Sequence, residues 1–492
     1  MPHDRPIHVC IVGAGVSGLR CADILLSHGF QVTVLEARDR IGGRICQSRE
    51  LGYDIDLQVS NFGPGANWIH TWDSGQVHPI WKLATETKTP VHHWNSKQML
   101  FDSAGKKLPD ETTDRLSTLL WKIIEEAFEY SAKAHEGHQQ PIPANDSLYD
   151  YIQRRCPEEM ADEQERDTLL QMSEMWGAYV GEPVWMQSLK FAWMEECCGG
   201  EEEMFVASTY SAILDRISKA AREGAEIVLK KRVVSVETSE RVSDKRVRVI
   251  TDDGSIQIFD EVVMSTPLGW LKKYRDCFSP PLSHRLYSAI DNLKLSQLEK
   301  VFITFPSAFW LSDKTADTFP SFTNWLRPKY ANDTNPHHWP QEIWNLAAFA
   351  PPNNHPTMLF YLYGDCSRFV VNSIYGKPRQ EKHDFLNNFF LPYYSRLPGY
   401  DSNDPHCTPK AILATEWLKD ELNGHGSYCN FQAGIKEADK DVGAFREGCV
   451  DQRLWFCGEH AAPFEECGTV AGAYLSGEFA GKNIVELYDR EP

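Results

Sequence analysis

Residues 7–36 constrain the fold more than any other part of the sequence. Residues 7–12 form a short, β-branched apolar run, which predicts a buried strand of a parallel sheet. A helical pattern of apolar residues follows and stops at Gly29, and residues 31–35 predict a second strand. The segment therefore predicts a complete strand–helix–strand unit of an α/β fold.

Three glycines join the first strand to the helix, Gly13, Gly15 and Gly18, in the spacing G-x-G-x-x-G. The first permits a tight turn, the second lets the backbone approach a pyrophosphate, and the third lets the helix pack closely on the strand. Free N–H groups at the helix start attract an anion. Glu36 ends the second strand, where a carboxylate accepts hydrogen bonds from a ribose hydroxyl and disfavours the 2′-phosphate of NADP. We therefore predict a dinucleotide site rather than a bare structural turn.

The next residues, ARDRIGGR, narrow the choice of cofactor. They include Arg38, Gly43 and Arg44, and a guanidinium here can neutralise a pyrophosphate from the side opposite the helix. A charged surface loop is the alternative, and it suits Arg38 better than the Gly43-Arg44 pair. The strings IVGAGVSGL and VLEARDRIGGR resemble the FAD-binding signature of the flavin-containing amine oxidase family, which includes monoamine oxidases, polyamine oxidases and lysine-specific histone demethylases. The resemblance implies FAD bound in an extended form.

The resemblance continues in the segment 65–70, although the preceding residues 61–64 depart from the family pattern. His70 resembles the active-site histidine of polyamine oxidases, which implies that it holds or deprotonates the substrate amine. An ordinary hydrogen-bonded loop histidine is the alternative. The residues that match the family's loop beside the flavin are Gly65, Ala66, Asn67 and Trp68.

The string LEKVFITF resembles the family strand whose lysine bonds through a water to flavin N5, and the matching lysine is Lys300. We expect an alternating strand that points its apolar side chains inward. Burial beside a neutral ring would lower the pKa of Lys300 and make it a proton acceptor near neutral pH. A solvated lysine on a strand face is the alternative.

Residues 416–434 resemble the family segment that places an aromatic ring against the substrate. Tyr428 is the matching position, and Trp417, in the same segment, is a predicted cofactor contact. In monoamine oxidases a cysteine just before this tyrosine is bonded to the flavin, whereas Ser427 precedes it here, so we predict noncovalent FAD. Thr469 stands where several family members have a second aromatic wall.

The resemblance also implies cofactor contacts in the second half of the chain. The backbone of Val233 matches the residue that contacts adenine, and Glu459 resembles the acid that binds the ribityl or pyrophosphate region. A helix that starts near Thr469 and Val470 would point its N–H groups at the flavin pyrimidine.

Several charged side chains have open roles. Glu182 and the acidic clusters at 195–196 and 201–203 are candidates to hold a substrate ammonium, but runs of charge are more often solvated surfaces. Arg327 or Arg368 would be needed to bind a carboxylate if the substrate were an amino acid. The loop-rich residues 311–356 are the part least like the family.

The patterns predict two domains. The first is an extended-FAD, Rossmann-like α/β domain of residues 1–85, 204–295 and 445–492. The second is a mixed sheet-and-helix substrate domain of residues 86–203 and 296–444. Within them, an apolar stripe over residues 116–128 predicts an amphipathic helix, Ser147-Leu-Tyr-Asp150 predicts a helix cap, and Asp252-Asp253-Gly254 predicts a hairpin turn.

Composition limits the partners and the compartment. The sequence has 50 Lys and Arg against 69 Asp and Glu, a formal net charge of −19, which argues against nucleic-acid binding. It has no apolar run of about 18 residues, so we expect no membrane span. The first strand begins too early for a signal peptide, and 13 irregularly spaced cysteines suit reduced thiols. We expect a cytoplasmic protein without a metal site.

The resemblance implies an FAD-dependent amine oxidase, most like the polyamine oxidases. Such an enzyme uses O₂ to convert a small-molecule amine to an imine, which hydrolyses to an aldehyde and an amine, and releases H₂O₂. Alternatives are a histone demethylase-like oxidase, disfavoured because no added N-terminal domain or long helical insertion is seen, an L-amino-acid oxidase, and a catalytically silent FAD-binding protein. The oligomeric state stays open. The predicted catalytic residues are Lys300, His70, Tyr428 and Thr469.

Overall fold

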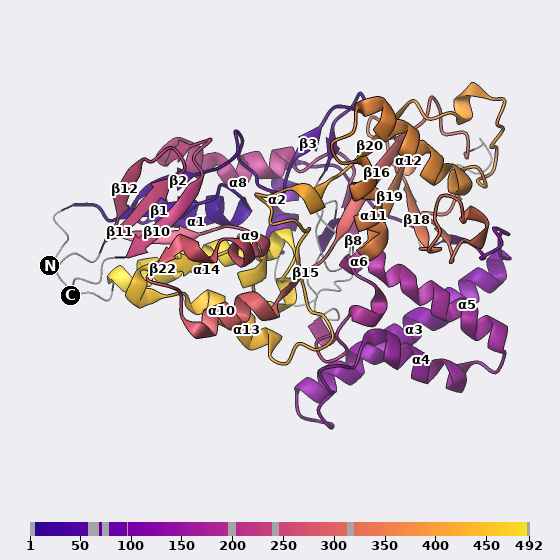
Figure 1. Cartoon of the computed structure of the whole chain (residues 1–492), viewed down its shortest axis with the longest axis horizontal. Helices are drawn as coiled ribbons and strands as arrows, with labels where there is room; N and C mark the ends of the chain where they lie inside the picture. Colours follow the sequence, from indigo (N-terminus) through magenta and orange to yellow (C-terminus); the bar gives the residue numbers. More distant parts are fainter. Residues whose placement is uncertain are drawn as a thin grey trace.

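The computed structural model describes residues 5–57, 68–70, 78–95, 97–194, 203–238, 246–311 and 319–489. The chain is elongated, with one large sheet near each end (Figure 1). A parallel sheet that contains β1 lies at one end, and an antiparallel sheet that contains β16 and β19 lies at the other.

The first large sheet has five strands, all parallel, in the order β22-β13-β1-β2-β9. Its strands come from distant parts of the chain, so no single segment could build it. The predicted strand–helix–strand unit is confirmed as β1, helix α1 (Val16–Ser27) and β2. The bounds of the strands are Leu454–Phe456 for β22, Glu261–Met264 for β13, His8–Val12 for β1, Gln31–Leu35 for β2 and Glu226–Val228 for β9.

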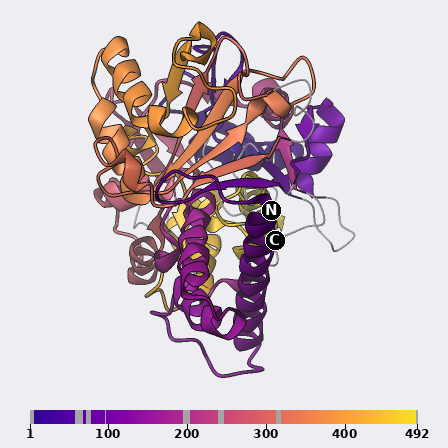
Figure 2. The ribbon, with the colours of Figure 1, turned by 90° about the vertical axis from the view of Figure 1, so that its right-hand side faces the viewer.

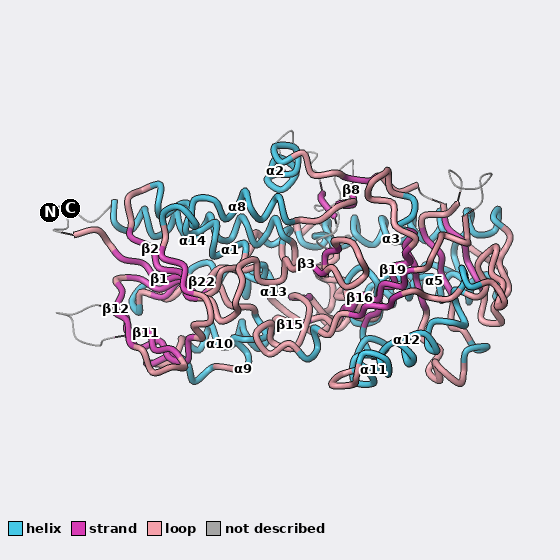
Figure 3. The backbone as a smooth tube through the Cα atoms, turned by 90° about the horizontal axis from the view of Figure 1, so that it is seen from above, coloured by secondary structure: helices cyan, strands magenta, loops and turns pink. Residues whose placement is uncertain are grey.

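Alternate residues of the parallel strands face two different layers, as the two-residue period of a strand requires. Val9 and Ile11 belong to the same buried cluster as residues of α1, α8 (Ser211–Gly224) and α14 (Val470–Asp489). Cys10 and Val12 belong to the cluster formed with a four-stranded sheet. Figure 3 shows the three helices on one side of β1 and β2, and β11 and β12 on the other. The fold class, a Rossmann-like α/β layer structure with a second mixed region, is confirmed.

The four-stranded sheet has the order β12-β11-β10-β14. Strands β11 and β12 are antiparallel and are joined through Gly254, whose φ of +80° suits a tight turn. The predicted hairpin is therefore confirmed. The bounds are Ile256–Phe259 for β12, Val247–Thr251 for β11, Val233–Thr238 for β10 and Phe278–Ser279 for β14.

The second large sheet has six strands in the order β20-β16-β19-β18-β17-β7, antiparallel except for the parallel pair β17 and β7. All seven residues of β16 are buried, so the expectation of a strand with one inward face was wrong. Both faces are covered, one by α11 (Gly364–Ile374) and α12 (Arg379–Tyr394), the other by a cluster that includes Tyr428. The bounds are Ala411–Ala414, Leu298–Thr304, Thr357–Tyr363, Gln341–Asn345, Phe322–Trp325 and Gln98–Phe101, in sheet order.

A group of helices lies beside this sheet: α3 (Asp110–His135), α4 (Leu148–Glu159), α5 (Glu163–Ser173) and α6 (Gly177–Val180). Figure 2 shows the purple helices below the orange strands. The predicted stripe is confirmed in α3, where Leu116, Leu120 and Phe128 are buried. The cap is confirmed too, because Ser147 and Asp150 form a reciprocal capping box.

None of the described helices combines the length and apolar character that a bilayer crossing needs.

Shorter elements connect the two ends. The small sheets are β3 (Gln47–Ser48) with β4 (Ile55–Asp56), β15 (Lys294–Leu295) with β21 (Cys429–Asn430), and β5 (Trp68–His70) with β8 (Glu203–Val206) and β6 (Val91–His92). The other α-helices of the described residues are α2 (Pro79–Thr87), α9 (Leu268–Lys273), α10 (His284–Asn292) and α13 (Ala438–Glu447).

Candidate active site

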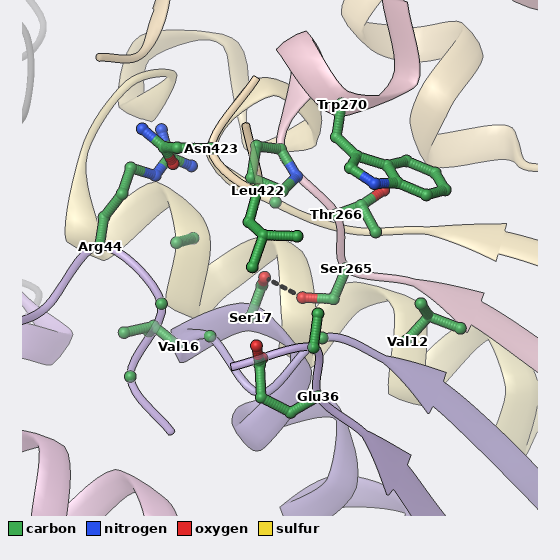
Figure 4. A pocket seen from close by; sticks show the side chains of 18 of the residues that line it. Val12, Val16, Ser17, Glu36, Arg44, Ser265, Thr266, Trp270, Leu422 and Asn423 are labelled. Carbon is green, nitrogen blue, oxygen red and sulfur yellow. Dashed lines mark hydrogen bonds between the residues drawn. The ribbon is translucent and has the colours of Figure 1, made fainter. Parts of the chain in front are cut away.

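A cavity opens at the carboxyl ends of β1 and β2, beside the start of α1 (Figure 4), and we call it the dinucleotide cavity. It holds about 1040 Å³ of space free of protein atoms, including the solvent-filled space at its mouth. Its wall also contains residues that the sequence analysis missed, such as Trp270 and Asn423, because only the fold brings α9 and the loop before Tyr428 to this place. The predicted residues that line it are Gly13, Gly15, Glu36, Arg38, Gly43, Arg44, Val233, Glu459, Thr469 and Val470.

The three motif glycines have different surroundings. A Cβ on Gly18 would lie 2.2 Å from the carbonyl oxygen of Gly13, so Gly18 is required for helix packing. Gly13 has a φ of +110°, and its Cβ would meet the Ser265 carbonyl oxygen at 2.9 Å. Gly15 begins α1 with no side-chain cap, and a Cβ there would meet nothing within 4 Å. The space in front of Gly15 and the N-terminus of α1 therefore fit a phosphate group.

Glu36 joins the glycine turn to the end of β2. Its two carboxylate oxygens accept 2.8 Å hydrogen bonds from the backbone N–H groups of Ala14 and Arg38. Each oxygen keeps a second lone pair. Because Glu36 also lines the dinucleotide cavity, it can fix the turn and still accept a hydrogen bond from a ribose hydroxyl.

The two predicted arginines hold the loop that leads to Tyr428. Arg38 donates to Asp420 at 2.8 Å, and Arg44 donates to the Ser427 carbonyl at 2.8 Å and to Glu459 at 3.0 Å. Burial alone would raise the pKa of Glu459, but Arg44 and His460 overcome it and hold that pKa below its usual value. Glu459 is therefore an ionised link between Arg44 and this loop.

Lys300 is fully buried in β16. It shares its strand face with Leu298 and Phe302, and its Nζ is 5.7 Å from the centre of the Tyr361 ring. Burial lowers the pKa of Lys300 well below its ordinary value, and the nearby Asp56 offsets part of that shift.

Asp56 is a site residue that the sequence analysis missed. It is buried and accepts hydrogen bonds from Gln47 Nε2 at 2.7 Å and from the backbone N–H of Tyr210 at 2.8 Å. Burial raises its pKa, so Asp56 and Lys300 form a coupled pair of ionisable groups inside the protein. No sequence motif marks Asp56, because the pairing joins a short strand to a distant one.

Tyr428 and Trp417 belong to the same buried cluster as Tyr361. The Tyr428 hydroxyl donates to the carbonyl oxygen of Tyr179 at 3.2 Å. Trp417 and Gly18 are not among the described residues that line the dinucleotide cavity. Trp417 shares a buried cluster with Leu298 and Phe302, the two residues that lie on the same strand face as Lys300.

Thr469 lies just before α14 and caps it. Its Oγ1 accepts a hydrogen bond from the N–H of Gly472 at 2.8 Å and donates to Glu466. The helix begins at Val470, as the sequence predicted, and both residues line the dinucleotide cavity. The N-terminus of α14, with its positive end of the helix dipole, therefore borders the dinucleotide cavity.

Some predicted residues lie outside the described part of the chain. These are Gly65, Ala66, Asn67 and the acids at 195–196 and 201–202. The backbone of His70 is described in β5, where it pairs with Glu203, and that of Trp68 pairs with Phe205. The side chains of Trp68, His70 and Glu203 also lie outside the description.

The remaining charged candidates have partners. Arg327 pairs with Glu174, and Arg368 donates to Glu182 at 2.5 Å. Burial raises the pKa of Glu182 to about 7, although Arg368 opposes the shift. Both arginines that could have served a substrate carboxylate are therefore already engaged.

This arrangement of a nucleotide-type cavity and a buried lysine belongs to a recognisable class. The sequence model of the family described as "Flavin containing amine oxidoreductase" matches residues 16–485. The chain therefore belongs to that family, whose members are oxidoreductases that use a flavin.

Among curated proteins, the chain is 27% identical over 486 residues to "Lysine-specific histone demethylase 1 homolog 2" of Arabidopsis thaliana, covering 97% of this chain and 58% of that protein. It is 29% identical over 485 residues to "Probable polyamine oxidase 4" of the same organism, covering 96% and 86%. Among solved structures, cyclohexylamine oxidase from Brevibacterium oxydans IH-35A matches with a TM-score of 0.69 at 18% identity, covering 99% of this chain and 100% of that one. The last comparison concerns the fold alone.

Proposed function

We propose that this protein is an FAD-dependent oxidase of polyamines or of related primary or secondary amines. The observation that carries the proposal is the convergence of ten predicted cofactor contacts on one cavity that has room for a dinucleotide. The similarity to a protein named as a polyamine oxidase supports the substrate class. When bound, FAD supplies the redox chemistry: it takes two electrons from the amine and passes them to O₂, which yields H₂O₂.

The chain's own residues bind and orient the reactants. The first turn of α1 would face the pyrophosphate, and Glu36 would accept from the ribose. The start of α14, with Thr469 as its cap, would face the flavin ring and stabilise negative charge there. Tyr428 would form a wall for the substrate, and His70 would hold or deprotonate the substrate amine.

Lys300 would hold a water and accept a proton. Complete burial keeps its amine neutral over a larger part of the pH range than an exposed lysine allows. Asp56 would position Lys300 and would raise its pKa part of the way back toward the ordinary value. Lys300 and Asp56 are both buried, and the Lys300 Nζ lies 5.7 Å from the centre of the Tyr361 ring, so the proposed proton acceptor is away from bulk water.

We propose that the FAD is held noncovalently. Ser427, the residue before Tyr428, is buried and shares a 2.9 Å hydrogen bond with Ser296, and a serine at that position cannot form the thioether found in monoamine oxidases. We also propose that residues 1–85, 204–295 and 445–492 form the FAD-binding domain and residues 86–203 and 296–444 the substrate domain. The separation of the two large sheets in Figure 1 supports this division.

An anaerobic screen of amines tests the proposed function. The purified protein, loaded with FAD, is mixed with polyamines, acetylated polyamines, simple monoamines, amino acids and a methylated histone peptide, and the flavin absorbance band is followed. We expect polyamines to bleach the band fastest. Faster bleaching by the histone peptide would favour the demethylase-like alternative, which is supported by the similarity to a demethylase homologue. No bleaching by any amine would contradict the proposal.

A further inference from the structure

A carboxylate is buried in β16 directly beside Lys300, on the other face of the strand. Glu299 is 1% exposed and precedes Lys300 in the chain, so the two side chains leave the sheet in opposite directions. Glu299 therefore points to the same side as Val301 and Ile303, which pack in the cluster formed with α11 and α12. The mechanism proposed above gives this acid no role.

The Glu299 carboxylate binds the loop that follows β20. Its Oε2 accepts a 2.5 Å hydrogen bond from the Thr415 hydroxyl, and its Oε1 accepts a 2.9 Å hydrogen bond from the backbone N–H of Leu418. The backbone N–H of Trp417 also donates to this carboxylate. One acidic side chain thus holds both ends of the segment 415–418.

Thr415 links this carboxylate to Lys300. Strands β20 and β16 are paired as far as Ala414 and Val301. One residue further on, the Thr415 N–H donates to the Lys300 carbonyl at 2.9 Å, and the Thr415 hydroxyl accepts from the Lys300 N–H at 2.8 Å. Because the same hydroxyl donates its proton to Glu299, the three residues form one chain of hydrogen bonds.

Burial makes Glu299 a costly group to keep at this position. It raises the pKa of Glu299 to about 7, although the hydrogen bonds from the loop oppose the shift. The neighbouring Glu416 raises that pKa further, and Glu416 is itself bonded to Lys382 of α12. A buried acid with a shifted pKa beside a proposed site is a candidate for a functional role.

The loop that Glu299 holds connects two predicted site residues. Trp417 packs in the buried cluster that contains Leu298 and Phe302, the neighbours of Lys300 on its strand face. The backbone of Lys300 is bonded to Thr415 at the start of the same loop. A shift of this loop would therefore move Lys300 and Trp417 relative to each other.

We propose that Glu299 is a positioning residue, which through Thr415 fixes the place of Lys300 and through the N–H groups of residues 417–418 fixes the place of Trp417. Glu299 is not among the described residues that line the dinucleotide cavity, so it acts through these residues rather than on the reactants. The inference rests on the proposed oxidase function and deepens it, because it names the group that holds the proton acceptor in place.

Two substitutions that preserve size test the link to Lys300. Glu299→Gln keeps an acceptor for Leu418 but places a donor opposite the Thr415 hydroxyl, and Thr415→Val removes that hydroxyl. In each FAD-loaded variant we expect O₂ uptake at saturating amine to fall about 10-fold, the effect of a small misplacement of a reacting group. The amine dissociation constant, measured by anaerobic bleaching, changes less than about 2-fold. Thr415→Ser keeps the hydroxyl and restores most of the parental rate.

Combined variants show whether Glu299 acts through the lysine. In a Lys300→Met background, Glu299→Gln changes the rate of O₂ uptake less than about 2-fold, because the group that it positions is gone. Glu299→Gln and Thr415→Val together are no slower than the slower single variant by more than about 2-fold, since both break the same chain. Effects that multiply in either combination would overturn the inference.

Glu261→Gln is the matched control for damage to the fold. Glu261 is also fully buried in a strand, β13, and accepts hydrogen bonds from Arg453, Trp455 and Tyr488. It stands at the start of that strand, whereas the dinucleotide cavity lies past the strand's other end. We expect a lower melting temperature and the parental rate of O₂ uptake. A loss of rate equal to that of Glu299→Gln would contradict a specific role for Glu299.

Cofactor affinity tests the link to Trp417 without relying on turnover. Glu299→Leu removes both acceptors and leaves the loop N–H groups unsatisfied, so we expect the FAD dissociation constant to rise about 10-fold. Glu299→Gln, which keeps the acceptor for Leu418, raises it less than about 3-fold. Titration of the flavin-free proteins with FAD measures both values. Equal FAD affinity in the parent and in Glu299→Leu would separate Glu299 from the position of Trp417.

The failure of this inference differs from the failure of the proposed function. If the parent consumes O₂ with an amine and Glu299→Gln and Thr415→Val match the parent, Glu299 does not position Lys300 and the oxidase function stands. If the parent oxidises no amine, the proposed function fails and the role of Glu299 fails with it.

Discussion

At the scale of single residues, burial decides the chemistry of Lys300. The side chain is fully enclosed within a sheet that is covered on both faces, and this enclosure lowers its pKa. The neighbouring Asp56 is buried as well, and burial raises its pKa. The two groups therefore share a proton more evenly than the same pair would in water.

The first prediction concerns the role of Lys300 as a proton acceptor. Protonation of the amine removes the acceptor, so the rate of O₂ consumption of the parent protein falls as the pH falls through the lowered pKa of Lys300. In Lys300→Met we expect a rate about 100-fold lower and without that acidic limb. Steady-state O₂ uptake across the pH range measures both effects.

An exposed lysine supplies the control for this prediction. Lys294→Met removes a charge near the same loop without touching the buried pair, and it keeps the parental rate and pH profile. Parental O₂ uptake and pH dependence in Lys300→Met would remove Lys300 from the proposed mechanism.

Sequence reasoning reached some of these residues and not others. Lys300, Tyr428 and the glycine turn lie in local strings that resemble a family, so their positions could be named before the fold was known. Asp56 lies in no such string. It acquires its role from Lys300, a partner far away in the chain, and no local pattern contains that information.

At the scale of elements, close approach between α1 and α14 fixes the floor of the dinucleotide cavity. A Cβ on Gly477 in α14 would lie 2.1 Å from the carbonyl oxygen of Ser17 in α1. Gly443, within α13, has nothing within 4 Å of the same ideal position. These two helical glycines therefore differ in the space available to a side chain: Gly477 has no room for a methyl group, whereas Gly443 has.

The second prediction uses this pair. Gly443→Ala raises the free energy of unfolding by about 0.5–1 kcal/mol, because alanine has the better helix propensity and finds free space. Gly477→Ala lowers it by about 1–3 kcal/mol despite the same gain in propensity, because α14 must move away from α1. Thermal unfolding of both variants measures the contrast, and a higher melting temperature in Gly477→Ala would disprove the close packing.

Local patterns predicted the helices and hairpins well where one apolar face decides the structure. The stripe of α3 and the capping box of α4 are examples. The strand β16 was predicted poorly, because a sheet covered on both faces no longer alternates between apolar and polar residues. The parallel pairing of β7 with β17 could not be predicted, since it joins segments about two hundred residues apart with no signal in either.

At the scale of the whole molecule, the dinucleotide cavity is assembled from segments spread over the chain. Its wall combines the turn after β1, Val233 in β10, α9, and the start of α14. A ligand that binds all of these segments at once stabilises the folded state over the unfolded chain.

The third prediction follows from this arrangement. Adding FAD to flavin-free protein at about 100 times its dissociation constant raises the free energy of unfolding by about 2.7 kcal/mol, and the melting temperature rises accordingly. In Gly15→Asp the new side chain projects into open space in the cavity, and its charge repels the pyrophosphate. The flavin-free melting temperature of this variant is not lowered, because Asp is a favourable helix cap, but FAD no longer raises it.

A fourth measurement completes the comparison of glycines. Gly18→Ala, in contrast to Gly15→Asp, lowers the flavin-free melting temperature, because its Cβ would meet the Gly13 carbonyl oxygen. If Gly15→Asp and Gly18→Ala behaved alike in both conditions, the distinction between a glycine that leaves room for a ligand and one that permits packing would be lost.

The order of strands in the parallel sheet has a consequence for synthesis on the ribosome. Strand β1 is made first, but its neighbour β13 is made after half of the chain, and β22 and α14 come near the end. The nascent polypeptide therefore carries unpaired, apolar strand edges for most of translation, when they can associate with other chains. Because the start of α14 completes the wall of the dinucleotide cavity, we expect the cofactor to be captured only after this last helix emerges.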